Sequence, residues 1–129
     1  MVVVIALLGV IGISVPAGAA VATAQSAVAD DLCNGTSGCI TVDISFSNRS
    51  ATAVGTVFDD KNAGSTTAVF DFYTANGFWS EQTRTATNAR TPFHFSEAGP
   101  AGGISYVVVY LVSNATGEPS SDSLVFIKP

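Results

Sequence analysis

Alternation between apolar and polar side chains, rather than helical spacing, organises this chain beyond residue 39. In residues 40–46 (ITVDISF), every second side chain is large and apolar, and the side chains between them are polar. A period of two is typical of a strand with one buried and one exposed face. We therefore expect Ile40, Val42, Ile44 and Phe46 to face a core, and the backbone to pair between strands.

Further short runs rich in β-forming residues follow, with turn residues between them. The expected strands are residues 53–58, 66–74, 78–85, 91–95, 104–112 and 123–128. Pro92 places the strand at 91–95 on a sheet edge, because proline cannot donate a ladder hydrogen bond. Together with residues 40–46, this spacing predicts an all-β fold, a single antiparallel β-sandwich of about seven strands.

Residues 104–119 (ISYVVVYLVSNATGEP) resemble the last hairpin of a fibronectin type III domain, although the early core tryptophan of that family is absent. The resemblance implies an immunoglobulin/fibronectin-III-like architecture. The strand at 104–112 is apolar on both faces, which indicates a central strand. One face holds Ile104, Tyr106, Val108, Tyr110 and Val112, and the other holds Val107, Val109 and Leu111. One face is expected to lie in the core, and the other either to be covered by loops or the N-terminal tail or to form a partner surface.

An export signal is expected to precede the sandwich. Residues 2–29 carry no charged side chain, and the apolar stretch of residues 2–15 has the length of a signal-peptide core. We predict a signal peptide at residues 1–24 with cleavage after Ala24, or alternatively after Ala29, followed by a tail and disulfide loop at 25–39 and the sandwich at 40–129. The absence of Lys or Arg after Met1 departs from the usual pattern, and an uncleaved membrane anchor or a buried helix are the alternatives.

Cys33 and Cys39 enclose a glycine-rich loop and are expected to form a disulfide, as an even and closely spaced pair does in an oxidising compartment. Closing so short a loop contributes roughly 2 kcal/mol in the chain-entropy model. The alternative is a pair of free or metal-binding thiols, but the spacing matches no zinc site. The cysteines therefore support a secreted, extracellular location.

The number and distribution of charged residues argue against some classes of binding partner. The formal net charge is −5, only 12% of residues are charged, and no basic cluster occurs. Binding to nucleic acid, or to membrane after signal cleavage, is therefore not expected. No motif predicts a cofactor or a metal site.

The hairpin around Asn76-Gly77 allows two registers. A two-residue turn pairs Ala75 with Phe78 and turns Glu81 toward the core, which is unfavourable for an unpaired carboxylate. A three-residue turn pairs Thr74 with Phe78 instead. We favour the second register, which places Phe70, Phe72 and Phe78 in the core with Ser80 and Gln82.

In that register, Tyr73 lies beside Trp79 on the outer face, with the carboxylates of Asp71 and Glu81 next along the ladder. Aromatic rings flanked by oriented polar groups form many small-ligand sites, so these four residues are the candidate ligand-binding residues. The alternatives are an aromatic pair that only protects the hairpin, or a metal site. Because like charges opposite each other repel, a cation or Arg84 is expected nearby.

Two other segments suggest chemistry only superficially. Residues 59–64 (DDKNAG) have oxygen ligands at alternating positions, but their order does not match a calcium-binding loop, so we expect a polar turn. His94, the only histidine, lies between two aromatic residues of an alternating strand and should face outward. No nucleophile motif accompanies it, and no catalytic residue is predicted.

These observations favour a small secreted, monomeric, non-enzymatic binding module, whose ligand is an unknown extracellular protein or carbohydrate. The alternative is a secreted inhibitor or toxin-like effector of another protein that uses the loop at residues 99–103. An enzyme is not expected.

Overall fold

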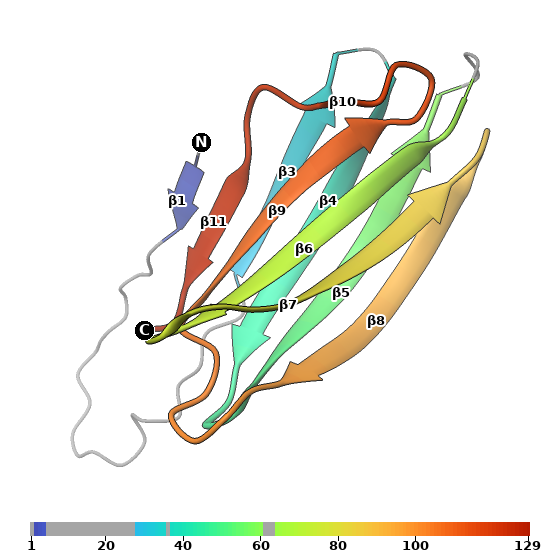
Figure 1. Cartoon of the computed structure of the whole chain (residues 1–129). Helices are drawn as coiled ribbons and strands as arrows, with labels where there is room; N and C mark the ends of the chain where they lie inside the picture. The colour runs from blue at the N-terminus through green and yellow to red at the C-terminus, as the bar shows by residue number, and fades with distance from the viewer. Residues whose placement is uncertain (1, 5–27, 36, 61–63) are drawn as a thin grey trace.

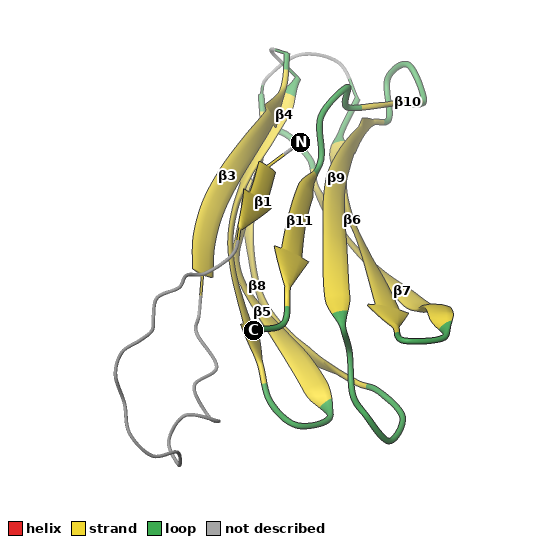
Figure 2. Cartoon of the chain, turned by 90° about the vertical axis from the view of Figure 1, so that its left-hand side faces the viewer, coloured by secondary structure: helices red, strands yellow, loops and turns green. Residues whose placement is uncertain are grey.

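The computed structural model describes residues 2–4, 28–35, 37–60 and 64–129. This part of the chain is all-β and forms two sheets that stack face to face (Figures 1 and 2). The first sheet has the strand order β3-β4-β5-β8, and we call it the β4 sheet. The second has the order β1-β11-β9-β6-β7, with β10 paired to β9, and we call it the β6 sheet.

The strands of the β4 sheet are β3 (Val28–Asn34), β4 (Gly38–Phe46), β5 (Ser50–Asp59) and β8 (Arg90–Ala98). Those of the β6 sheet are β1 (Val2–Val4), β6 (Thr66–Thr74), β7 (Gly77–Ala86), β9 (Tyr106–Ser113), β10 (Glu118–Pro119) and β11 (Leu124–Ile127). All seven predicted strands are present. β8 lies at the edge of its sheet, as Pro92 predicted.

The core lies between the sheets and is built by the alternation seen in the sequence. The four apolar side chains predicted to face inward from residues 40–46 are all buried. Facing them across the sandwich are the inward side chains of the β6 sheet, including Phe70 and Phe72. The rings of Phe93 and Phe95 on β8 pack edge-on against Phe70, with centroids 5.2 and 5.0 Å away.

Strand β3 occupies residues that the sequence analysis assigned to a tail and disulfide loop. It pairs antiparallel with β4 along its whole length, from Val28↔Ile44 to Asn34↔Gly38. The prediction missed it because Asp30 and Asp31 interrupt any apolar alternation. The β4 sheet therefore has one strand more than the pattern from residue 40 onward predicts.

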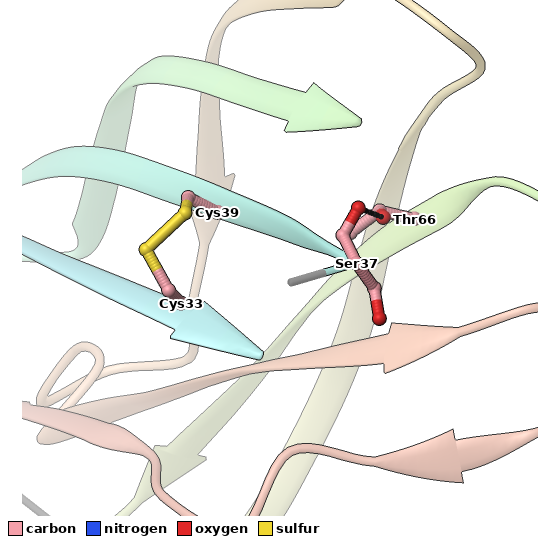
Figure 3. The surroundings of a disulfide bond; sticks show 4 residues. All are labelled: Cys33, Ser37, Cys39 and Thr66. Carbon is pink, nitrogen blue, oxygen red and sulfur yellow. Dashed lines mark hydrogen bonds between the residues drawn. A yellow bond between two sulfur atoms is a disulfide. The ribbon is translucent and has the colours of Figure 1, made fainter. Parts of the chain in front are cut away.

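Cys33 and Cys39 form the predicted disulfide, with an S–S distance of 2.07 Å. They are directly paired residues of β3 and β4, on the outer face of the β4 sheet (Figure 3). In the loop between these strands, the carbonyl of Ser37 accepts a hydrogen bond from Thr66 Oγ1 on β6 (3.3 Å). The loop is thus joined to the opposite sheet.

Near the N-terminus, Val2–Val4 pair in parallel with β11, in the register Val2↔Leu124. These residues belong to the apolar stretch predicted as an export signal. Most of that stretch and the cleavage site after Ala24 lie outside the described residues. Within the described part of the chain, no helix is long and apolar enough to span a membrane.

Strand β9 is central, as its two apolar faces predicted, and lies between β6 and β11. Val107, Val109 and Leu111 are buried in the core. The prediction was wrong in placing Ile104 on the same strand face as the tyrosines. The strand begins at Tyr106, and Ile104 is fully buried in the preceding loop.

Candidate functional site: the outer face of the β6 sheet

The β6–β7 hairpin differs at its tip from both registers that the sequence offered. Thr74 pairs with Gly77 and Tyr73 with Phe78, so the turn residues are Ala75 and Asn76. Neither the Ala75–Phe78 pairing nor the favoured Thr74–Phe78 pairing is correct. Gly77, just after the turn, has a φ of 111°, a conformation that favours glycine.

A β-bulge follows the tip and restores the rest of the favoured register. The pairing shifts between Phe72 and Tyr73, so Trp79 is the extra residue of β7. Beyond it, Phe72 pairs with Ser80 and Asp71 with Glu81, as predicted. The two carboxylates are therefore neighbours on the outer face.

The bulge also exchanges the two aromatic residues of β7. Phe78, predicted to lie in the core, is 60% exposed and packs beside Tyr73, with ring centroids 5.8 Å apart. Trp79, predicted to lie beside Tyr73, instead donates a hydrogen bond from Nε1 to the carbonyl of Ala98 on β8 (2.9 Å). The predicted Tyr73–Trp79 pair is thus replaced by a Tyr73–Phe78 pair.

Side chains join β7 to β8 along the side of the sandwich where these two edge strands meet. Ser80 Oγ and Gln82 Nε2 each donate a hydrogen bond to Glu97, to Oε2 and Oε1 respectively, both at 2.8 Å. The guanidinium of Arg84 lies 4.2 Å from the centre of the Phe95 ring. We call these contacts, with the Trp79 hydrogen bond, the seam. Trp79 therefore has a structural partner within the fold.

The outer face of the β6 sheet carries an apolar row that crosses four strands. Ile127 of β11 pairs with Tyr106 of β9, Tyr106 with Tyr73 of β6, and Tyr73 with Phe78 of β7. We call these four residues the aromatic row. Both ends are open to solvent, since Ile127 is 43% exposed and Phe78 is 60% exposed. No other described element packs over this face (Figure 2).

The two tyrosines of the row stack on each other. Their ring centroids are 4.6 Å apart and their planes differ by 4°. Because neighbouring strands are about 4.8 Å apart, the rings stand side by side, with one face of each ring against the other. These ring faces are consequently used within the protein, and the row presents mainly ring edges and hydroxyl groups to solvent.

The next row along the sheet contains the carboxylates. Val125 of β11, Val108 of β9, Asp71 of β6 and Glu81 of β7 follow one another across the strands. Glu81 is exposed, whereas Asp71 is partly buried, and its Oδ1 is shielded from solvent without a hydrogen-bond partner among the described residues. Burial raises the pKa of Asp71 to about 6, and its hydrogen bond with Glu81 and the charge of Glu81 act in the same direction.

Among the described strand residues of this face, the expected cation is not found beside the pair. Arg84 Nη1 donates hydrogen bonds to Gln82 Oε1 (3.2 Å) and to the carbonyl of Thr83 (2.7 Å), on the seam. The positions of β6, β7, β9 and β11 that face outward hold no Lys, Arg or His. Instead, burial raises the pKa of Tyr73 and Tyr110, and the charges of Asp71 and Glu81 raise both further.

The turn that superficially matched a calcium loop is tied to the fold through Asp59. Its Oδ1 accepts a hydrogen bond from Thr66 Oγ1 (2.6 Å), and its Oδ2 accepts one from the backbone N–H of Asn88 (2.7 Å). Asp59 also lines a hollow of about 400 Å³ beside the disulfide. Residues 61–63 lie outside the described part of the chain. No group of three or more His, Cys, Asp or Glu among the described residues could hold a metal ion.

Two other predicted features lie elsewhere. His94 is exposed on the outer face of the β4 sheet, as predicted, and Val54 separates it from Asp43 in the same row. In the loop at 99–103, the N–H of Gly99 donates to the carbonyl of Arg49 (2.6 Å), and the N–H of Gly103 donates to the carbonyl of Pro100 (2.8 Å). In this loop only the small residues Ala101 and Gly102, at its tip, are exposed.

Sequence reasoning missed Tyr106, Phe78 and Ile127 as members of the candidate site. The alternation in β9 did place Tyr106 on an outer face, but which residues lie beside it depends on how β9 pairs with β6. No protein-family model, curated protein or solved structure matches this chain. The proposal that follows therefore depends on the geometry of the site.

Proposed function

We propose that this chain is an exported, non-enzymatic binding module that recognises an extracellular protein with the outer face of its β6 sheet. The observation that carries the proposal is the aromatic row, which runs unbroken from Ile127 to Phe78. Contiguous apolar side chains that reach solvent are characteristic of interaction sites. Tyrosine and phenylalanine are also enriched in protein interfaces.

The ring geometry favours a protein over a saccharide. A sugar stacks on an open ring face, but Tyr73 and Tyr106 each place one face against the other. Trp79, which the sequence predicted as a ligand-binding residue, has its indole N–H bound to the carbonyl of Ala98 on the seam. A protein surface can pack against ring edges, the exposed Phe78 and the aliphatic side chains of the same face.

The strand arrangement supports an immunoglobulin/fibronectin-III-like architecture. We number the strands along the chain from β4 and leave out β10. The first, second and fifth strands (β4, β5 and β8) then share one sheet, and the third, sixth and seventh (β6, β9 and β11) share the other. Strands A, B and E and strands C, F and G are divided in the same way in immunoglobulin domains. The fourth strand, β7, pairs with the third strand here.

Export and cleavage after Ala24 are part of the proposal. Strand β3 begins at Val28, so cleavage after Ala24 leaves the whole strand in the mature chain. Cleavage after Ala29 would remove two of its residues. Cleavage would also remove Val2–Val4 from the edge of β11. Mass spectrometry of the chain recovered from culture medium should therefore give Gln25 as the first residue. A chain that keeps residues 1–24 in the cell envelope would contradict export.

Photo-crosslinking tests the binding face. A photoreactive residue at position 78 of the exported chain should give one predominant adduct with a protein of its native surroundings. The matched control carries the same group at position 54, where Val54 is 41% exposed on the opposite outer face. Equal labelling from both positions, or adducts sensitive to glycosidase rather than protease, would contradict a protein-binding face on the β6 sheet.

A secreted inhibitor or toxin-like effector remains the alternative function. Such a protein would use the loop at 99–103, and an adduct from position 101 in place of position 78 would favour it.

A further inference from the structure

The outer face of the β6 sheet combines an apolar row with an acidic pair, and the strand residues of that face that the structure describes include no Lys, Arg or His. We propose that it binds a protein segment that places a basic side chain, Lys or Arg, against Asp71 and Glu81 while its apolar residues cover the aromatic row. This inference rests on the proposed binding function and specifies the chemistry of the partner.

The acidic pair lies next to the aromatic row on the same face. Asp71 lies directly opposite both Val108 and Glu81, and Tyr73 is the next outward residue on its own strand. A partner that covers the aromatic row therefore reaches the carboxyl groups one row further along the sheet. Any docked surface would cover both features together.

A partner that covers the acidic pair needs a complementary positive charge. Covering two adjacent carboxyl groups with an apolar surface would remove water from them without replacing it, which is strongly unfavourable. A basic side chain from the partner removes this penalty, since it neutralises the pair at the exposed carboxylate of Glu81. Glu81 is exposed, so the pair is accessible from solvent.

Three of the basic side chains that the structure places make their contacts elsewhere. Arg84 packs over Phe95 on the seam, Arg90 lies 5.0 Å from the centre of the Phe58 ring, and Lys128 Nζ donates to the carbonyl of Asn48 (3.2 Å). Each of these contacts lies away from Asp71.

The neighbouring rings suit the stem of such a side chain. Lys and Arg have long aliphatic stems that pack on apolar surface while the charged head reaches a polar group. Tyr73 and Tyr110, whose pKa values are raised, keep neutral hydroxyl groups beside the acidic pair.

Selection from a phage-displayed library of random linear peptides on the intact exported protein tests the inference. The selected peptides should share one Lys or Arg at a fixed distance from aromatic or aliphatic residues. A selected peptide should bind the Asp71→Asn/Glu81→Gln double variant at least about tenfold more weakly, because close charge pairs in interfaces have large coupling energies. The matched control, Asp43→Asn, removes an exposed carboxylate from the opposite outer face and should leave affinity unchanged.

A peptide with Gln in place of its basic residue completes a double-mutant cycle. It should lose the same factor on the wild-type protein and almost nothing on the double variant. Peptides that bind through the aromatic row without a basic residue, or that bind the double variant equally well, would overturn this inference and leave the proposed function standing. If selection yields no peptide and position 78 gives no adduct, the proposed function fails, and this inference with it.

Discussion

The two outer faces of the sandwich are built from strands of similar length, yet their side chains differ sharply. On the β4 sheet, outward positions hold mainly threonine, serine and aspartate, and Thr52 Oγ1 hydrogen-bonds to Ser96 Oγ across the strands (2.7 Å). On the β6 sheet, the outward positions of β9 and β11 hold tyrosine, valine and isoleucine, and those of β6 and β7 add Tyr73, Phe78 and the acidic pair. Threonines lie beside them, and Thr67 hydrogen-bonds to Thr85 across the strands (2.7 Å). A polar outer face needs only solvent, as is common for antiparallel sheets. The contrast indicates that the β6 sheet is the face with a partner.

Two carboxylates near β7, Glu97 on the seam and Asp71 on the outer face of the β6 sheet, also differ in how well the fold satisfies them. Glu97 on the seam accepts hydrogen bonds from both Ser80 and Gln82, so the fold satisfies both of its oxygens. Asp71 shares a hydrogen bond with another acid and leaves Oδ1 without a partner among the described residues. A buried acceptor without a partner costs about 1–3 kcal/mol. The seam is therefore complete within the fold, whereas the acidic pair is not.

The largest expected effect is on binding, from a change at the end of the aromatic row. Phe78→Ser should weaken affinity for the partner identified by cross-linking about thirtyfold or more, as loss of an aromatic hot spot of about 2 kcal/mol does. Titration by isothermal calorimetry measures the change. Val54→Ser, on the polar face, is the control and should have no effect. Equal losses from both variants would remove the distinction between the faces.

The disulfide lies on the polar face and should affect stability but not binding. The Cys33→Ser/Cys39→Ser variant should lower the free energy of unfolding by about 2 kcal/mol, because the unfolded chain gains conformational freedom. Denaturant titration measures this loss. Partner affinity measured below the unfolding transition should match wild type, and reduced affinity would mean that the polar face contributes to recognition.

Trp79 should stabilise the seam rather than bind a ligand. Trp79→Phe keeps an aromatic ring but removes the N–H that donates to Ala98, and should lower stability by about 1 kcal/mol. The variant should retain full partner affinity, in contrast to Phe78→Ser. A loss of affinity without a loss of stability would restore Trp79 as a ligand-binding residue.

The smallest expected effect comes from the acidic pair. Because the pKa of Asp71 rises from 3.8 to about 6 on folding, the folded chain holds this proton more tightly than the unfolded chain. Stability contributed by the protonated carboxyl is therefore fully present below pH 4 and is lost as pH rises through 6. Glu81, Tyr73, Tyr106 and Tyr110 are the titratable groups around it.

Asp71→Asn should remove this pH dependence. At pH 7 the variant should be more stable than wild type by roughly 0.5 to 1 kcal/mol, a value reduced by solvent screening of the pair, and the difference should vanish near pH 4. Thermal unfolding at both pH values measures it. Asp43→Asn on the polar face should show no comparable gain, and an equal gain there would mean that net charge alone is responsible.

The sequence by itself determined the features that depend on local pattern. Alternation at 40–46 placed four side chains in the core, the two closely spaced cysteines predicted their bond, and Pro92 placed its strand at an edge. The free-energy cost of burying the unpaired carboxylate of Glu81 was enough to choose the register in which Asp71 lies opposite Glu81. Each of these inferences needs only the period of a strand, the chemistry of a residue type or the cost of burying charge.

Only the tertiary structure decided the bulge near the hairpin tip and which side chains meet between strands that are distant in sequence. The bulge at Trp79 accompanies its hydrogen bond to Ala98, which lies on a strand of the other sheet, and this bulge exchanges the places of Phe78 and Trp79. The stack of Tyr73 on Tyr106 likewise requires β6 to pair with β9 in one register. Contacts between residues distant in sequence depend on how all the side chains of both sheets pack together. A local sequence pattern does not contain this information.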